Sequence, residues 1–119
     1  MRKQLDFLVL ISYCSLIYWL SAQSVLPGTD LFENEDKLQH FLAYAIMGIC
    51  AWRVLRHFMH NSLLLMILSF GFCSLYGLSD EWHQSFVMGR TPSSMDWLAD
   101  SFGGLLASIA CGWQHKKTI

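Results

Sequence analysis

The chain has 119 residues, which is enough for one domain. Hydrophobic residues make up 54% of it and charged residues 14%, whereas soluble domains average about 45–50% and about 25%. This shortage of charge indicates a membrane protein, and a formal net charge of -1 gives no basis for binding nucleic acid.

Four apolar segments follow one another along the chain, and each is near the ~20 residues that a membrane-spanning helix needs. Strongly polar residues gather at the ends of these segments, while the middles are apolar on every side. A soluble bundle would instead carry polar stripes along whole helices. We therefore predict an all-α fold, a four-helix transmembrane bundle that forms a single membrane domain over residues 1–119. The predicted spans are residues 5–22, 38–55, 62–79 and 97–113.

The distribution of lysine and arginine predicts how these spans are oriented, because basic residues favour the cytoplasmic side. If both termini are cytoplasmic, six of the eight basic residues lie on that side. The basic residues on the cytoplasmic side are then Arg2, Lys3, Arg53, Arg56, Lys116 and Lys117. The alternative is that the first segment is a signal peptide cleaved near residues 22–24, which would leave three spans.

The second segment begins with a polar stripe. Asp36, His40 and Tyr44 are spaced four apart and lie on one helix face, bordered by Lys37. A histidine this close to the hydrocarbon is costly unless it has a partner. We predict His40 as a catalytic candidate and Asp36, Lys37 and Tyr44 as ligand-binding candidates. The alternative is a helix cap at Asp36 and a lysine that reaches the headgroups.

The third segment ends in Asp80, Glu81 and Gln84. Two carboxylates at a helix C-terminus oppose the helix dipole, at a cost of about 0.3–1 kcal/mol each. A positive group must compensate, and the candidates are Lys37, Arg90, His40 or a bound cation. We predict Asp80 and Glu81 as catalytic candidates and Gln84 as a ligand-binding one. Arg90, in the following loop, is predicted to clamp a carboxylate inside the protein or on a ligand.

The fourth segment carries Asp96 and Asp100 at its start. Asp96 is either a helix cap in a Ser-x-x-acid pattern or a catalytic candidate. Asp100 lies one turn deeper, where capping cannot explain it, and is predicted to bind a ligand. Two rows of small residues follow and let neighbouring helices approach closely. One row continues the aspartate stripe, so both aspartates are predicted to face the bundle interior. The rows are Ala99, Gly103, Ala107 and Gly104, Ser108, Gly112.

These three polar motifs, in this order and at this spacing, resemble the VanZ-like family of small bacterial membrane proteins over about residues 21–106. Two positions depart from the family pattern. Asp100 stands where asparagine is more frequent, which adds a charge, and Met88 stands where proline is usual. The matching residues are Asp36, Lys37, His40 and Tyr44, then Asp80, Glu81, Gln84, Phe86, Gly89 and Arg90, then Asp96, Asp100 and Gly103.

The resemblance implies a multi-pass protein of the bacterial cytoplasmic membrane with a role at the cell envelope. The family's namesake is associated with resistance to the glycopeptide teicoplanin, which acts outside the membrane on cell-wall precursors. We expect the polar site to bind or shield a lipid-linked envelope component. The expected partners are membrane lipids and a lipid-linked cell-wall precursor.

Two other functions fit the same residues. The first is a small intramembrane hydrolase or transferase in which His40 acts as acid or base, while Asp80, Glu81 and Asp96 orient it or hold a metal. The second is a purely structural polar network. The sequence therefore leaves open whether the protein is an enzyme, and it identifies no cofactor, although a divalent metal is one possibility.

Overall fold

The computed structural model describes residues 2–21, 35–87 and 94–118, and the side chains of residues 2–20, 38–87 and 94–114 among them. These ranges contain four α-helices and no β-strand, which confirms the predicted all-α four-helix fold. The helices are α1 (Arg2–Ser21), α2 (Glu35–Leu55), α3 (Ser62–Gln84) and α4 (Ser94–Thr118).

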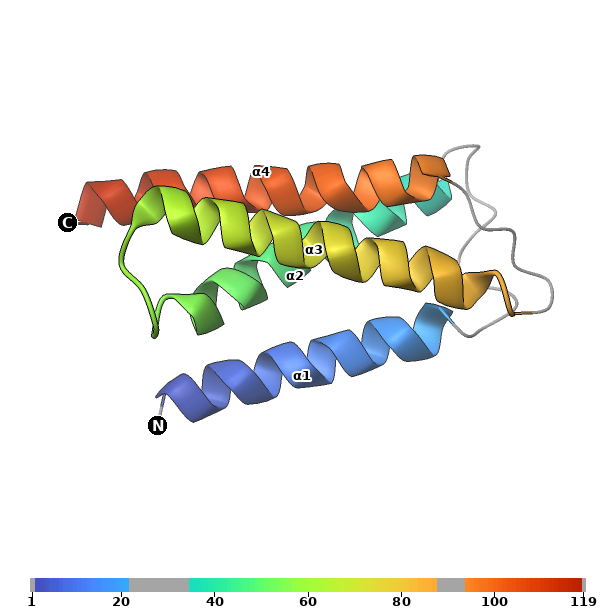
Figure 1. Cartoon of the computed structure of the whole chain (residues 1–119), viewed down its shortest axis with the longest axis horizontal. Helices are drawn as coiled ribbons and strands as arrows, with labels where there is room; N and C mark the ends of the chain where they lie inside the picture. The colour runs from blue at the N-terminus through green and yellow to red at the C-terminus, as the bar shows by residue number, and fades with distance from the viewer. Residues whose placement is uncertain (1, 22–34, 88–93, 119) are drawn as a thin grey trace.

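The helices run alternately up and down, so the start of α1 and the end of α4 lie at the same end of the molecule (Figure 1). At the opposite end, α2 begins, α3 ends and α4 begins. Three helices, α2, α3 and α4, form the closely packed part of the bundle, and α1 lies beside α2 and α3 with fewer contacts.

Each helix begins or ends beyond the apolar segment that predicted it. The third is the clearest case, because α3 continues from the predicted end at residue 79 through Gln84. Its start is fixed by Asn61, whose side chain accepts a hydrogen bond of 3.1 Å from the backbone N–H of Leu64. Hydropathy marks only the apolar part of a helix, whereas the backbone stays helical through the polar motif that follows. Asp80 and Glu81 are therefore held on a helix and not on a loop.

Small residues bring α4 into close contact with its neighbours, as the two predicted rows require. A Cβ atom on Gly103 would collide with the carbonyl oxygen of Phe41 in α2. A Cβ atom on Gly48 would lie 3.0 Å from the Cβ of Ala107. On the other side of α4, Gly104 packs against Cys73 of α3. The rows therefore set how closely α4 approaches both partners.

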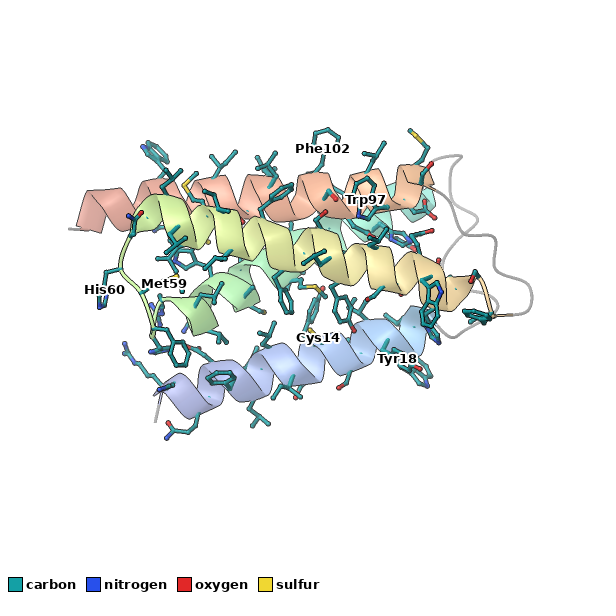
Figure 2. All side chains as sticks on the ribbon, in the orientation of Figure 1. Cys14, Tyr18, Met59, His60, Trp97 and Phe102 are labelled. Carbon is teal, nitrogen blue, oxygen red and sulfur yellow. The ribbon has the colours of Figure 1, made fainter. Side chains whose placement is uncertain are left out.

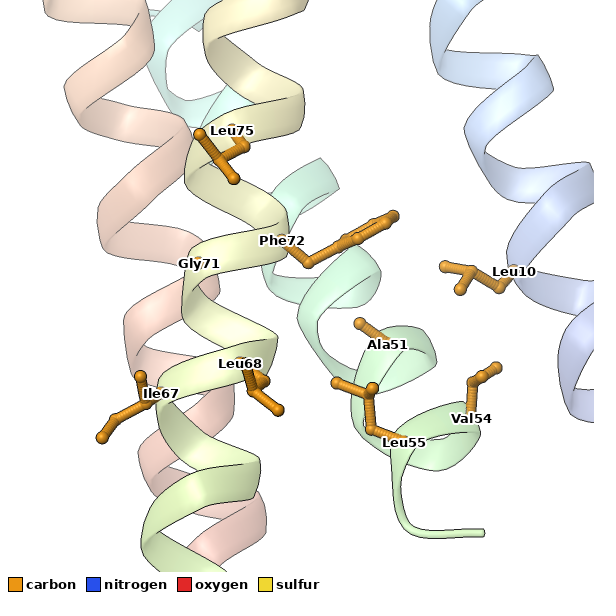
Figure 3. A pocket seen from close by; sticks show the side chains of 9 residues that line it. All are labelled: Leu10, Ala51, Val54, Leu55, Ile67, Leu68, Gly71, Phe72 and Leu75. Atoms are coloured by element: carbon orange, nitrogen blue, oxygen red, sulfur yellow. The ribbon is translucent and has the colours of Figure 1, made fainter. Parts of the chain in front are cut away.

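Helix α1 is attached by hydrogen bonds that join side chains to backbone carbonyls. Tyr13 donates to the carbonyl of Ala43 at 2.7 Å, and Tyr76 donates to that of Cys14 at 2.6 Å. An apolar hollow of about 490 Å³ lies between α1, α2 and α3 (Figure 3). Leu10 faces this hollow from α1. The attachment of α1 is thus less continuous than the packing of α4.

The outer surface of the bundle is largely apolar. Leu75 is 70% exposed and Phe102 is 59% exposed, and Phe102 points away from the bundle (Figure 2). Two helical stretches, Leu38–Leu55 and Ser62–Gln84, are long and apolar enough to cross a membrane. Among the described residues, only these two stretches have the length and apolarity of a membrane span. The spans expected at residues 5–22 and 97–113 therefore stay predictions.

Candidate functional site

A cluster of polar side chains is buried between α2, α3 and α4, near the end where α4 begins. Five of its members carry a carboxyl or imidazole group, and the other two are a tyrosine and a glutamine. Burial of so many polar groups in an apolar bundle is costly unless they pair with one another or with a ligand. We call this the polar cluster; its members are His40, Tyr44, Asp80, Glu81, Gln84, Asp96 and Asp100.

The centre of the polar cluster is a pair formed by His40 and Asp100. The ring nitrogen Nδ1 of His40 lies 2.7 Å from Oδ1 of Asp100, a hydrogen-bond distance. His40 is 8% exposed and Asp100 is 0% exposed. The close approach of α2 and α4 at Gly103 brings the two residues together, since Gly103 lies three positions after Asp100 on α4.

Helix α3 closes the other side of Asp100. A Cβ atom on Gly77 would lie 2.9 Å from Oδ2 of Asp100, so a larger residue there would crowd this carboxylate. One turn further along α3, Asp80 accepts a hydrogen bond of 3.2 Å from the hydroxyl of Tyr44. Three helices therefore hold the two aspartates and the histidine in place.

Asp96 lies next to this centre, with its Oδ2 atom 4.0 Å from Nε2 of His40. It occupies the first turn of α4 and is 6% exposed. The prediction that Asp96 and Asp100 face the interior is thus confirmed. Ser93, the predicted capping residue, lies outside the described residues, so that alternative stays open.

Three residues of the cluster form a potential metal-binding group. His40, Asp80 and Asp100 each offer one ligand atom, and these atoms all lie within 4.8 Å of one another. Glu81 and Gln84 are buried on the same face of α3 as Asp80 and extend the cluster toward the helix end. The arrangement can bind a cation, or it can orient His40 for proton transfer.

The remaining predicted site residues cannot be placed in the same way. Asp36 and Lys37 lie in the first turn of α2, but their side chains are outside the described residues. Arg90 is outside them altogether. Their predicted ligand-binding roles stay predictions.

A second group of ionisable side chains, in which Asp6 is buried and its partners are partly exposed, lies at the opposite end of the bundle and was not predicted from the sequence. Asp6 of α1 contacts Nε2 of His57 at 2.7 Å, Arg53 at 3.2 Å and Arg56 at 3.6 Å. The sequence feature that could have pointed to this group is Asp6 itself, an acidic residue close to Arg2 and Lys3 at the start of the first apolar segment. Because Asp6 has three partners on and just after α2, its role is to attach α1 to α2.

The molecule is thus an all-α bundle with a carboxylate–histidine cluster inside one end and two helices that have the length and apolarity of membrane spans. The VanZ/LLP1 family model matches residues 7–114, which include most of α1 and α4 and all of α2 and α3. The chain belongs to the VanZ/LLP1 family, and the resemblance seen in its motifs is confirmed. No curated protein and no solved structure matches it.

Proposed function

We propose that the chain is a multi-pass protein of the bacterial cytoplasmic membrane that binds or shields a lipid-linked component of the cell envelope at the outer face. The observation that carries this proposal is the polar cluster, buried at one end of a bundle whose exterior is apolar. A lipid-linked precursor would present hydrocarbon to the apolar helices, and its phosphate headgroup would meet the basic residues that the motifs carry beside the cluster, Lys37 and Arg90.

The apolar exterior supports a membrane location for the whole bundle as one domain. Large apolar side chains are exposed on every helix, for example Leu8 on α1, Ile46 on α2, Leu75 on α3 and Phe102 on α4. In water, so many exposed apolar side chains would promote aggregation. In a membrane, the apolar side chains can contact lipid directly. The helices are then held together by close packing at small residues and by buried polar contacts.

The distribution of charge supports an outward-facing polar cluster. Arg2 and Lys3 at the start of α1 share one end of the bundle with Arg53 and Arg56 at the end of α2. Basic residues favour the cytoplasmic side. Both termini are then cytoplasmic, and the polar cluster, at the other end, is extracytoplasmic.

Position at the outer face connects the site with cell-wall precursors. Lys37 lies in the first turn of α2, about one turn before His40, and Arg90 follows the end of α3 by six residues in the sequence. We propose that these two residues bind the phosphate or carboxylate groups of the lipid-linked component, because arginine in particular pairs with such groups in a bidentate manner. Shielding this component would reduce its access to glycopeptides such as teicoplanin, so resistance is a proposed consequence.

Native mass spectrometry of the full chain, released gently from detergent, tests the binding proposal. We expect wild-type protein to retain a phosphate-bearing lipid-linked species. In Arg90→Ala, the fraction of protein with bound lipid should fall by at least about tenfold, because a charge-assisted hydrogen bond is lost. Lys3→Ala is the matched control, since it removes a cation at the opposite end. Absence of any retained lipid, or equal loss in both variants, would contradict the proposal.

The pairing of His40 with Asp100 favours a second candidate function, an intramembrane hydrolase or transferase. A carboxylate that orients an imidazole is the arrangement of a general base, and it would activate water toward the same lipid-linked precursor. The residue roles would be proton transfer by His40 and orientation by Asp100, with Asp80, Glu81 and Asp96 completing the site.

Substitution of His40 and Glu81 by glutamine separates the two candidates. We expect His40→Gln and Glu81→Gln to remain folded in detergent, because glutamine keeps hydrogen-bonding capacity at each position. A binding protein should then retain its lipid in both variants, whereas an enzyme should lose turnover of that lipid. If either variant is recovered only as unfolded protein, the polar cluster has a structural role instead.

A further inference from the structure

We propose that His40, Asp80 and Asp100 together bind one divalent transition-metal ion, of the zinc or manganese type. The ion would lie inside the polar cluster, between α2, α3 and α4. This site goes beyond the proposed function, and it depends only on residues whose side chains the structure describes.

The donor atoms are close enough for a common ion. One imidazole nitrogen and two carboxylate oxygens lie within 4.8 Å of one another. Bonds from zinc to histidine and carboxylate ligands are about 2.0–2.2 Å long, so two ligands of one ion are separated by at most about 4.4 Å. Small side-chain shifts therefore bring all three atoms into the range of a single ion.

A buried oxygen atom provides independent support. Oδ2 of Asp100 is inaccessible to solvent and has no hydrogen-bond partner among the described residues. A carboxylate oxygen in this position is costly unless a cation or a donor satisfies it. Gly77 gives it room on the α3 side, next to the turn that carries Asp80. A bound ion would supply the missing partner.

The charges of the three residues also match a divalent ion. Two aspartates and a neutral imidazole carry a charge of -2, which one divalent cation balances, and Asp96 and Glu81 add further negative charge to the same cluster. Among the described side chains, Asp100 is hydrogen-bonded to His40 and Asp80 to Tyr44, and a tyrosine hydroxyl carries no charge. In a low-dielectric interior, this balance matters more than it would at a surface.

The donor types select the class of metal. Calcium and magnesium prefer sites made of oxygen ligands, whereas imidazole suits zinc and other transition metals. The hydroxyl of Tyr44 donates to Asp80 and would orient that carboxylate as an outer partner. Three ligands leave further positions on the ion for water or for an oxygen of a bound molecule.

Titration of the full chain with Mn²⁺ tests this site. The protein is purified in detergent with any affinity tag removed, treated with EDTA and dialysed, and free Mn²⁺ is followed by electron paramagnetic resonance. We expect one Mn²⁺ to bind per wild-type chain and to be displaced by Zn²⁺. Asp80→Asn and Asp100→Asn should each weaken binding by at least about 100-fold, because each removes a charged ligand and loss of an outer partner alone costs about 10–100-fold.

Asp6→Asn is the matched control. It makes the same substitution in the other buried aspartate that lies 2.7 Å from a histidine, at the opposite end of the bundle. We expect this variant to bind Mn²⁺ like the wild type. If Asp100→Asn does not fold, Asp80→Asn and His40→Gln make the same comparison.

Three results would overturn the proposal. They are no binding by the wild-type protein, binding that Asp80→Asn and Asp100→Asn leave unchanged, and binding that Asp6→Asn weakens equally. Because the titration measures bound Mn²⁺, and the substituted aspartates are not the residues assigned to the lipid phosphate, its outcome is independent of the lipid-binding proposal. Lipid retention without metal binding would refute only the metal site, and metal binding without lipid retention would refute only the lipid proposal.

Discussion

Gly103→Ala is expected to lower the free energy of unfolding by about 1–3 kcal/mol, because the added methyl group would collide with the backbone of α2. The obstacle is the carbonyl oxygen of Phe41, which cannot rotate away as a side chain can. Helices α2 and α4 must therefore move apart, and this displacement also separates His40 from Asp100. Unfolding of the purified protein in detergent, followed by circular dichroism, measures the loss.

Gly71→Ala is the control for this experiment. A Cβ atom on Gly71 would have no atom within 4 Å, and alanine is favoured over glycine within a helix by about 0.5–1 kcal/mol. We expect this variant to be as stable as the wild type or slightly more stable. Equal stability of the two variants would mean that α2 and α4 are not in close contact at Gly103.

His40→Leu is expected to destabilise the protein by about 3–5 kcal/mol, since it leaves a buried carboxylate without its ionic partner. Asp100 is 0% exposed and cannot turn toward water. The measurement is the free energy of unfolding in EDTA, so that loss of a metal does not contribute. His40→Gln should cost much less, because its side-chain amide can still donate to Asp100.

The double variant His40→Leu/Asp100→Asn shows whether this cost arises from the buried charge. Asparagine has nearly the shape of aspartate but no charge, so the double variant should be more stable than His40→Leu alone. The interaction between the two positions should then be of the order of 1–3 kcal/mol. If the two substitutions are simply additive, the close pair of His40 and Asp100 contributes nothing specific to stability.

Local patterns in the sequence predicted the four helices and the direction of several side chains. Hydropathy located the apolar part of each helix, and the four-residue spacing placed Asp96 and Asp100 on the face that packs inward. Such features depend on neighbours along one helix, which the sequence supplies directly. The family motifs were recognisable for the same reason, and the family match over residues 7–114 confirmed them.

Pairings between helices were not predictable to the same degree. The sequence named His40 and Asp100 as separate candidates, but their 2.7 Å contact links residues 60 positions apart. It also showed an acidic residue near the basic N-terminus, but it did not indicate that Asp6 contacts His57. Spacing along a chain does not fix which face of one helix meets another, because that depends on the packing of all the side chains between them.

The sequence by itself therefore determined the helical architecture, the family and the polar residues that gather at one end of the bundle. Only the tertiary structure decided which of these residues meet. The close approach at Gly103 and Gly77 places Asp100 between α2 and α3, beside His40 and near Asp80. Helix packing thus turns three separate motifs into one buried site, because glycines let three backbones come close enough for short polar side chains to touch.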